Sequence, residues 1–405
     1  MASTLSHLEC SACGERYDAD VAQNLCRDGK PLLARYDLAV AAKTLTRAAL
    51  RTREPSLWRY EELLPVRDYA RRVSLGETMT PLLATPRSSE RYGMELFVKD
   101  EALLPSGSFK ARGAAIGVSR ARELGIRECA MPTNGNAGAA WSAYAARAGM
   151  IAHIVMPQSG PRANQLEIVM AGADAYRVDG LIGDAGKIVA RAVASESWFD
   201  VSTLKEPYRV EGKKTIGFEL AEQFGWNVPD VIIFPTGGGV GLIGIGKALR
   251  ELHSVGLIGA KMPRIVAVQS TGCAPMVDAF EHGKDESTFW NDAKTIAFGT
   301  TVPKPLGDFL ILDWIRETRG TAIAVDDEMI LEKQRELTSD EGIFVCPEGA
   351  ATLAGAVALR KRGWIKDGER VLLINTGAGV KYADVPYPPP PLLPRDGSVP
   401  ISVAR

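Results

Sequence analysis

Four short segments of the sequence combine glycine with polar side chains in a way that could support chemistry. In the first, residues 105–113 (PSGSFKARG), Lys110 follows a loop and opens a predicted helix. The helix dipole disfavours a protonated amine at that end of a helix, so we expect Lys110 to be neutral or bonded to another group. A neutral lysine can form an imine with a carbonyl compound. Taken alone, Lys110 is also consistent with a solvated surface lysine, as most lysines are.

The second segment, residues 132–140 (PTNGNAGAA), is typical of a turn between a strand and a helix. Its backbone N–H groups, with the side chains of Thr133 and Asn134, suit a carboxylate at a helix N-terminus. The amide of Asn136 could donate a hydrogen bond to an oxygen on a ring. The alternative is an ordinary helix cap, in which threonine and asparagine are common.

The third segment, residues 236–244 (TGGGVGLIG), follows the apolar run VIIFP. Its consecutive glycines allow several backbone N–H groups to converge on a phosphate at a helix start. The spacing also fits the dinucleotide-binding fingerprint, which requires an acidic residue about 20 positions later. That residue is missing, because the next predicted strand ends at Gln269 and Ser270. We therefore favour a single phosphate monoester over a dinucleotide.

The fourth segment, residues 372–382 (LLINTGAGVKY), places Thr376 at the end of a predicted strand. Its hydroxyl could lie against a ring nitrogen, or it could cap a helix. Each segment has an ordinary structural explanation, but the coincidence of all four is improbable. Together they predict turns that surround one phosphorylated ring.

These segments need a scaffold that brings the ends of several strands together. From about residue 82, short apolar runs alternate with longer amphipathic stretches. This rhythm predicts an α/β fold with doubly wound, mainly parallel sheets covered by helices on both faces. In such sheets, ligands bind at the carboxyl ends of the strands. Residues 36–75, 137–148 and 182–195 are predicted to be helical. The predicted strands are 95–99, 128–132, 152–156, 175–178, 231–235, 265–269 and 371–375.

The composition excludes several classes of function. The 405 residues are 46% hydrophobic and 24% charged, as in an average globular protein. A formal net charge of −1 gives no overall attraction to nucleic acid or to an anionic membrane. No apolar run reaches the roughly 18–20 residues of a membrane-spanning helix, and the first residues do not resemble a secretory signal. We therefore expect a cytoplasmic protein that binds a small molecule, with no nucleic-acid or membrane partner.

Three of the six cysteines, Cys10, Cys13 and Cys26, cluster near the N-terminus. Their spacing is similar to that of a zinc ribbon, but the second Cys-x-x-Cys pair is absent. Asp28 could supply a fourth ligand, although an oxygen beside three thiolates is an uncommon set for zinc. The sequence therefore predicts a degenerate ribbon without a metal. At the other end, residues 385–394 (VPYPPPPLLP) indicate a polyproline II tail.

In this order, the four segments resemble those of the fold type II pyridoxal-phosphate enzymes, and most closely those of the threonine synthases. The resemblance extends from about Gly76 to Tyr382. It implies a pyridoxal 5′-phosphate cofactor in a cleft between two doubly wound, open-sheet domains, with Lys110 as the catalytic Schiff-base lysine. The cofactor contacts that it implies are Phe109, Lys110, Asn136, Gly237, Gly238, Gly239, Val240, Gly241 and Thr376. The substrate contacts that it implies are Thr133, Asn134, Ala137 and Arg209, with Arg209 near a substrate phosphate.

The resemblance also implies how the chain is divided. A large cofactor-binding domain would comprise residues 76–115 and 205–385, with a small domain, 116–204, inserted into it. Residues 1–75 would form an N-terminal extension that includes the degenerate ribbon, and residues 386–405 a proline-rich tail. Homodimers are usual among the proteins that the chain resembles.

The resemblance implies a threonine synthase-like activity, and other reactions on a small amino acid remain as alternatives at this point. A threonine synthase converts O-phosphohomoserine and water to threonine and phosphate. The motifs that contain Ala111 and Ala137 are instead closer to those of serine and threonine dehydratases, which release ammonia and a keto acid. A β-replacement on another β-substituted amino acid is intermediate between the two. A non-catalytic family member is the remaining alternative, and it requires that Lys110 binds no cofactor.

Overall fold

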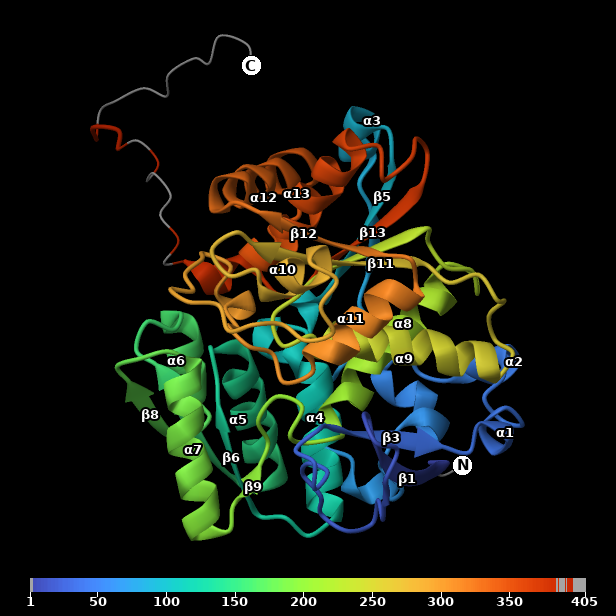
Figure 1. Cartoon of the computed structure of the whole chain (residues 1–405), viewed down its shortest axis with the longest axis vertical. Helices are drawn as coiled ribbons and strands as arrows, with labels where there is room; N and C mark the ends of the chain where they lie inside the picture. The colour runs from blue at the N-terminus through green and yellow to red at the C-terminus, as the bar shows by residue number, and fades with distance from the viewer. Residues whose placement is uncertain (1–2, 384, 386–389, 391, 396–405) are drawn as a thin grey trace.

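The computed structural model describes residues 3–383, 385, 390 and 392–395. The predicted proline-rich tail, 386–405, therefore lies almost wholly outside the described residues. The described chain forms three sheets, and the two larger ones have the predicted α/β architecture (Figure 1). The third is a small antiparallel sheet near the N-terminus.

The larger α/β sheet has six strands in the order β12-β11-β10-β13-β5-β4. Neighbouring strands are parallel, except that β4 pairs antiparallel with β5. Alternate residues of β10 enter two different cores: Ile232 and Phe234 pack on one face, and Val231 and Ile233 on the other. Helices therefore cover both faces. The strands are β4 (Leu82–Ala84), β5 (Glu95–Asp100), β10 (Val231–Pro235), β11 (Arg264–Ser270), β12 (Thr321–Val325) and β13 (Arg370–Asn375).

The smaller α/β sheet lies between β5 and β10 in the chain and has four parallel strands in the order β8-β7-β6-β9. Helix α5 (Asn136–Ala148) and helix α7 (Ile182–Glu196) cover its two faces. Helix α6 (Arg162–Met170) packs beside α5. The strands are β6 (Glu128–Pro132), β7 (Ile151–Pro157), β8 (Asp174–Val178) and β9 (Phe199–Asp200).

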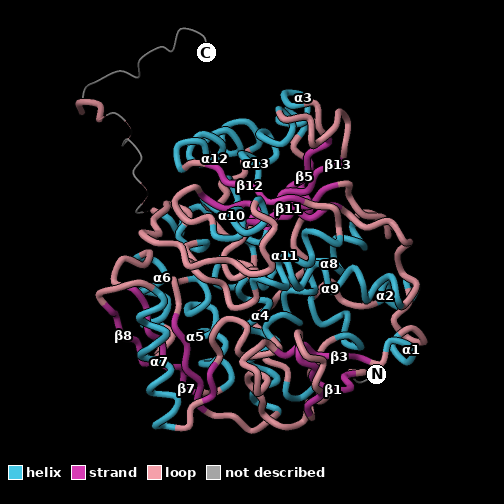
Figure 2. The backbone as a smooth tube through the Cα atoms, viewed as in Figure 1, coloured by secondary structure: helices cyan, strands magenta, loops and turns pink. Residues whose placement is uncertain are grey.

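Helix α4 (Lys110–Glu123) leads from the larger sheet into the smaller one, and α8 (Arg209–Gln223) leads back. Helix α9 (Val240–Ser254) packs along α8, and in Figure 2 the two helices lie between the larger sheet and the N-terminal sheet. The remaining helices pack mainly around the larger sheet; they are α3 (Pro86–Tyr92), α10 (Pro275–Glu281), α11 (Asp308–Glu317), α12 (Asp327–Glu341) and α13 (Pro347–Lys361). Short 3₁₀ turns lie at Glu101–Leu103, Pro105–Gly107, Phe298–Thr300 and Gly379–Tyr382.

The N-terminal sheet consists of β1 (Leu5–Cys10), β2 (Arg16–Tyr17) and β3 (Leu32–Tyr36). After it come α1 (Leu38–Ala41), α2 (Arg47–Thr52) and 3₁₀ helices at Leu57–Leu63 and Tyr69–Arg71. The helical prediction for 36–75 is therefore correct only for these short pieces. Pro55 and Pro65 help to explain the breaks, because proline lacks an N–H and restricts the residue before it.

All seven predicted strands are present, with ends that differ from the prediction by at most one residue. The short strands β4, β9 and β12 and the N-terminal sheet were not predicted. Among the described helices, none combines the length and apolar character that crossing a membrane requires.

Candidate active site

A cavity of about 250 Å³ lies at the carboxyl ends of β6, β10 and β13. All four glycine-rich segments contribute to its wall. The structure thus brings together every predicted site residue: Phe109, Lys110, Thr133, Asn134, Asn136, Ala137, Arg209, Gly237, Gly238, Gly239, Val240, Gly241 and Thr376.

Lys110 is the first residue of α4 and lines the cavity. The residue before it is anchored to the segment after β13, because the Phe109 N–H donates to the Thr376 carbonyl at 3.0 Å. The Lys110 amine lies 4.3 Å from the centre of the Phe109 ring. Burial, and next the positive charge of Arg209, lower the pKa of Lys110 to about 8. The neutral amine needed for imine chemistry is therefore accessible near neutral pH.

The glycine-rich turn joins β10 to α9. Gly239 has a φ of +75°, which favours glycine, and a Cβ there would lie 2.2 Å from Cδ1 of Ile311. A Cβ on Gly238 would lie 2.9 Å from Cγ2 of Thr203. Bare backbone at the N-terminus of the 15-residue helix α9 therefore lines the cavity, an arrangement suited to a phosphate. The other members of the turn in the cavity wall are Gly237, Val240 and Gly241.

In the turn between β6 and α5, the side chains of two predicted substrate contacts form hydrogen bonds within the protein. The Thr133 hydroxyl accepts hydrogen bonds from the N–H groups of Gly135 and Gly138 at 3.0 and 2.9 Å. The Asn134 amide donates to the carbonyl of Thr301 at 2.9 Å, which links this turn to the loop after Phe298–Thr300. These side chains thus fix the turn, and the start of α5 faces the cavity.

Asn136 belongs to a chain of hydrogen bonds along the cavity wall. Its Nδ2 donates to the Tyr382 hydroxyl at 3.1 Å, and that hydroxyl donates to Oε1 of Glu348 at 2.7 Å. The Gly299 N–H donates to the same oxygen at 2.6 Å. Asn136 Oδ1 and Glu348 Oε2 are buried without a hydrogen-bond partner among the described residues. Buried acceptors of this kind mark a place where a bound molecule completes the hydrogen bonding. Ala137 lies beside them in the wall.

Thr376 follows β13 in a neutral environment. Its Oγ1 lies 3.5 Å from Sγ of Cys346, which itself caps α13 by accepting from the Gly349 N–H at 3.3 Å. Burial raises the pKa of the Cys346 thiol well above its usual value, so the thiol stays protonated. Thr376 therefore offers the cavity an uncharged hydroxyl.

Two cations of α8, Arg209 and Lys213, line the same cavity. Arg209 donates to Oγ1 of Thr203 at 3.3 Å, and Lys213 donates to the carbonyl of Phe109. Burial lowers the pKa of Arg209 to about 10. Burial, and next the charge of Lys110, lower the pKa of Lys213 well below its usual value. Neither residue forms an ion pair with a carboxylate in the part of the chain that the structure describes. Burial therefore disfavours the charged forms of both side chains, and an anionic ligand in the cavity would favour them.

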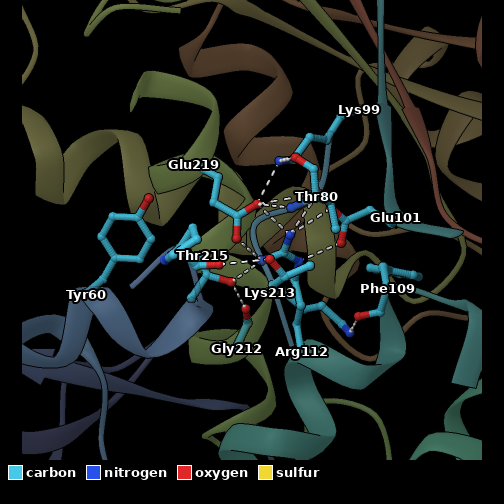
Figure 3. A network of polar contacts seen from close by, with 12 residues as sticks. Tyr60, Thr80, Lys99, Glu101, Phe109, Arg112, Gly212, Lys213, Thr215 and Glu219 are labelled. Atoms are coloured by element: carbon cyan, nitrogen blue, oxygen red, sulfur yellow. Dashed lines mark hydrogen bonds and ion pairs between the residues drawn. The ribbon is translucent and has the colours of Figure 1, made fainter. Parts of the chain in front are cut away.

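Buried charges link the helix that begins with Lys110 to α8, the helix that begins with Arg209 (Figure 3). Arg112 of α4 donates to Glu101 at 2.6 Å and to Glu219 of α8 at 2.5 Å. Lys99 donates to the same Glu219 carboxylate at 2.7 Å. The four side chains have no exposed surface. This cluster fixes the two helices, and thus the two cationic side chains, relative to one another.

The sequence interpretation did not assign Lys213, Glu348 or Tyr382 to the site. Lys213 stands four residues after Arg209, and this helical spacing places both on one face, a signal that could have been used. Glu348 had no such signal, because its partner Tyr382 is 34 residues away and only the fold brings them together.

Comparisons with known proteins agree with this geometry. The family described as pyridoxal-phosphate dependent enzyme matches residues 73–377. The chain is 36% identical to the threonine synthase of Methanocaldococcus jannaschii over 377 residues, which are 93% of each protein. It is 35% identical to the threonine synthase of Methanosarcina acetivorans over 374 residues, 92% of this chain and 91% of that protein.

Solved structures show the same fold. The structure of maize serine racemase superimposes with a TM-score of 0.65 at 24% sequence identity. The match covers 74% of this chain and 88% of the racemase chain. The predicted fold type II architecture is therefore confirmed.

Proposed function

Because the chain belongs to the threonine synthase family of pyridoxal-phosphate-dependent enzymes, we propose that it converts O-phosphohomoserine and water to threonine and phosphate. One observation supports this substrate above all: the cavity provides for two phosphate groups. The glycine turn at α9 suits the phosphate of the cofactor. Arg209 and Lys213 are separate cations without carboxylate partners among the described residues, and they suit a phosphate on the substrate.

The residues around the cavity fit pyridoxal 5′-phosphate. We infer that Lys110 holds the aldehyde carbon and that the backbone of residues 237–241 holds the phosphate. Asn136 and Thr376 would contact the ring oxygen and the ring nitrogen, with Phe109 beside the ring. The bare backbone of the turn at Gly238 supports this placement, and Asn136 Nδ2, which donates one hydrogen to the Tyr382 hydroxyl, has a second one for the ring oxygen. When bound, the cofactor draws electrons from Cα of an amino acid and makes its proton acidic.

Lys110 is the proposed proton carrier. Because its pKa is near 8, the amine can accept the α-proton near neutral pH and return a proton later. The network that fixes α4 holds this amine at one place in the cavity wall. Phosphate leaves from Cγ and a proton leaves Cβ, and water then supplies a hydroxyl to Cβ and a proton to Cγ, so that the atoms of the overall reaction balance.

The substrate would be held at both ends. We infer that the start of α5, with Thr133, Asn134 and Ala137, receives the α-carboxylate, because backbone N–H groups at a helix N-terminus favour an anion. Arg209 and Lys213 would receive the phosphate. This division predicts that shortening the cations affects phosphorylated substrates more than unphosphorylated ones.

Product analysis tests the proposal. Purified protein is supplied with O-phosphohomoserine, O-phosphoserine, threonine and serine, and phosphate, threonine, ammonia and keto acids are measured. Equal amounts of phosphate and threonine from O-phosphohomoserine are expected. The variant Lys110→Ala should lose both the activity and the visible absorbance of the bound cofactor. No turnover of O-phosphohomoserine would overturn the proposal.

The second candidate is a dehydratase, and Ala111 and Ala137 favour it. It predicts ammonia and 2-oxobutanoate from threonine. Arg209→Met separates the two activities, because it should reduce turnover of O-phosphohomoserine and leave deamination of threonine much less affected. Ammonia release with no phosphate-dependent activity would establish the dehydratase instead.

Three further predictions belong to the proposed function. We propose the domain division 76–115 with 205–385 and 116–204, which agrees with the two separate α/β sheets. Limited proteolysis tests this division. A homodimer and a cytoplasmic location are expected from the family, and light scattering and cell fractionation test them.

A further inference from the structure

We propose that the N-terminal sheet binds one zinc ion through Cys10, Cys13, Cys26 and Asp28. The sequence argues against a metal, because the fourth ligand would be an oxygen. The structure adds the geometry, in which three thiol sulfurs and one carboxylate oxygen all lie within 4.8 Å of one another. Zinc accepts cysteine sulfur and aspartate oxygen in tetrahedral sites.

Two of the separations between the ligand atoms are close to those of a tetrahedron around zinc, and all of them are 4.8 Å or less. With Zn–S near 2.3 Å, two sulfurs of a tetrahedron are separated by about 3.8 Å. Cys13 Sγ and Cys26 Sγ lie 3.7 Å apart. With Zn–O near 2.0 Å, a sulfur and an oxygen are separated by about 3.5 Å. Cys10 Sγ lies 3.3 Å from one oxygen of Asp28 and 3.7 Å from the other.

Two facing turns hold these atoms in place. In the first, the N–H groups of Ala12 and Cys13 both point to Cys10 Sγ at 3.4 Å, and Gly14 follows with a φ of +74°. N–H donors directed at a sulfur stabilise the thiolate form. A polypeptide turn that points several N–H groups at one thiol is therefore already arranged for a metal-bound thiolate.

The second turn presents the other pair of ligands. The Lys30 N–H donates to Oδ1 of Asp28 at 2.9 Å, and Gly29 has a φ of +77°. The Tyr17 hydroxyl donates to Sγ of Cys26 at 3.2 Å. Hydrogen bonds from outside the ligand set orient the ligands and offset their negative charge. Cys26 and Asp28 thus each have a donor in addition to the proposed metal.

The kind of ion follows from the ligands. Three thiolates favour zinc or another thiophilic metal over magnesium or calcium, which prefer oxygen. A disulfide does not account for the cluster, because the Cys13–Cys26 separation of 3.7 Å exceeds a bond of about 2.05 Å and Cys10 would remain unpaired.

The loop between Cys13 and Cys26 gives the metal a role in the enzyme. Asn24 of this loop donates to the carbonyl of Asp200 at 2.7 Å, just before the cavity residue Thr203. The Tyr208 hydroxyl donates to the Ala19 carbonyl at 2.9 Å, and Tyr208 precedes Arg209. The zinc ion would therefore hold the loop that packs against residues 200–209, the segment that leads to the proposed substrate-binding Arg209.

Metal analysis of the full-length protein tests the site. Protein purified under reducing conditions without chelator is expected to contain one zinc per chain by mass spectrometry. Asp28→Asn keeps an acceptor for the Lys30 N–H but removes the charge, and it should weaken zinc affinity about tenfold or more in chelator competition. Asp18→Asn is the matched control, because Asp18 is exposed in the same sheet region and likewise accepts from a backbone N–H.

Spectroscopy provides an outcome that does not depend on activity. Cobalt(II) bound in place of zinc should show the intense visible absorption of a tetrahedral thiolate site, and Cys13→Ser should abolish it. Asp28→Cys should retain metal with the spectrum of a four-thiolate site. A wild-type protein that takes up no zinc or cobalt under reducing conditions, or equal affinities for Asp28→Asn and wild type, would overturn the proposal.

Discussion

Replacing Arg112 with methionine tests whether buried charges hold α4 and α8 in place. The guanidinium donates to Glu101 at 2.6 and 2.9 Å and to Glu219 at 2.5 and 2.7 Å. In the variant, Glu219 keeps the amine of Lys99 at 2.7 Å. Glu101 still accepts a hydrogen bond from the Thr80 hydroxyl at 2.6 Å, but it has no ion pair with another cation among the described residues. The variant therefore contains a buried carboxylate whose charge is uncompensated.

The expected loss of stability follows from the carboxylate that loses its cation. Removing one partner of a buried ion pair typically costs about 3–5 kcal/mol. Arg112 and Lys99 together outweigh the burial of Glu219 and lower the pKa of its carboxyl group below the usual value. The interaction of this carboxylate with its cations therefore stabilises the fold in a pH-dependent way. Since the pKa is lower in the folded state, the stabilisation is present above about pH 5 and is lost as the pH falls towards 2.

Urea unfolding at pH 7, followed by tryptophan fluorescence, measures the effect. Arg112→Met should lower the free energy of unfolding by about 3–5 kcal/mol, and the difference from wild type should narrow as the pH falls below about 5. Arg147→Met, at an exposed position on α5, is the control and should change it by less than about 0.5 kcal/mol. The double variant Arg112→Met/Glu101→Gln restores charge balance and should recover much of the loss. A loss below about 1 kcal/mol, or a double variant no more stable than the single one, would refute this reasoning.

Three further predictions concern the cavity. The rate at which cofactor-free protein reacts with pyridoxal 5′-phosphate should rise with a midpoint near pH 8, because the neutral Lys110 amine reacts; a midpoint above pH 10 in stopped-flow absorbance would contradict this. Gly239→Ala should weaken cofactor binding about tenfold or more in a titration, because its Cβ would lie 2.2 Å from Ile311 Cδ1. Gly256→Ala controls for backbone strain, because Gly256 has a φ of +76° and a Cβ there would meet no atom within 4 Å. Lys213→Met should raise the KM for O-phosphohomoserine about tenfold or more while the absorbance of the bound cofactor persists. An unchanged KM would exclude Lys213 from phosphate binding.

The sequence predicts the strands that end at the cavity because each is a short apolar run followed by a turn-forming residue. β10 is the clearest example, with five buried residues followed directly by the glycine turn. Within that turn Gly239 has a φ of +75°, a conformation that favours glycine. Local pattern and local geometry agree at these positions, and prediction succeeds there.

Prediction fails where the deciding contact is distant in sequence. The place of β12 at the edge of the larger sheet comes from its pairing with β11, 55 residues earlier, and its sequence, TAIAV, does not show that place. The sequence names Asp28 as a possible fourth ligand, but its short distance to Cys10 depends on the antiparallel pairing of β1 with β3. The sequence alone therefore does not show that the carboxylate lies beside the three thiols.

Lys213 and Lys214 show most clearly what only the fold decides. Both are buried, yet Lys214 forms ion pairs with Glu211 at 2.6 Å and with Glu251 at 2.8 Å, whereas Lys213 faces the cavity without a carboxylate partner among the described residues. Burial disfavours the charged form of Lys213, and a phosphate that enters the cavity would favour it. Lys213→Met should therefore weaken the binding of a phosphorylated substrate and cost the free protein less stability than Lys214→Met, which breaks two buried ion pairs. The two adjacent lysines differ because α8 directs Lys214 towards Glu251 of its neighbour α9 and Lys213 towards the cavity.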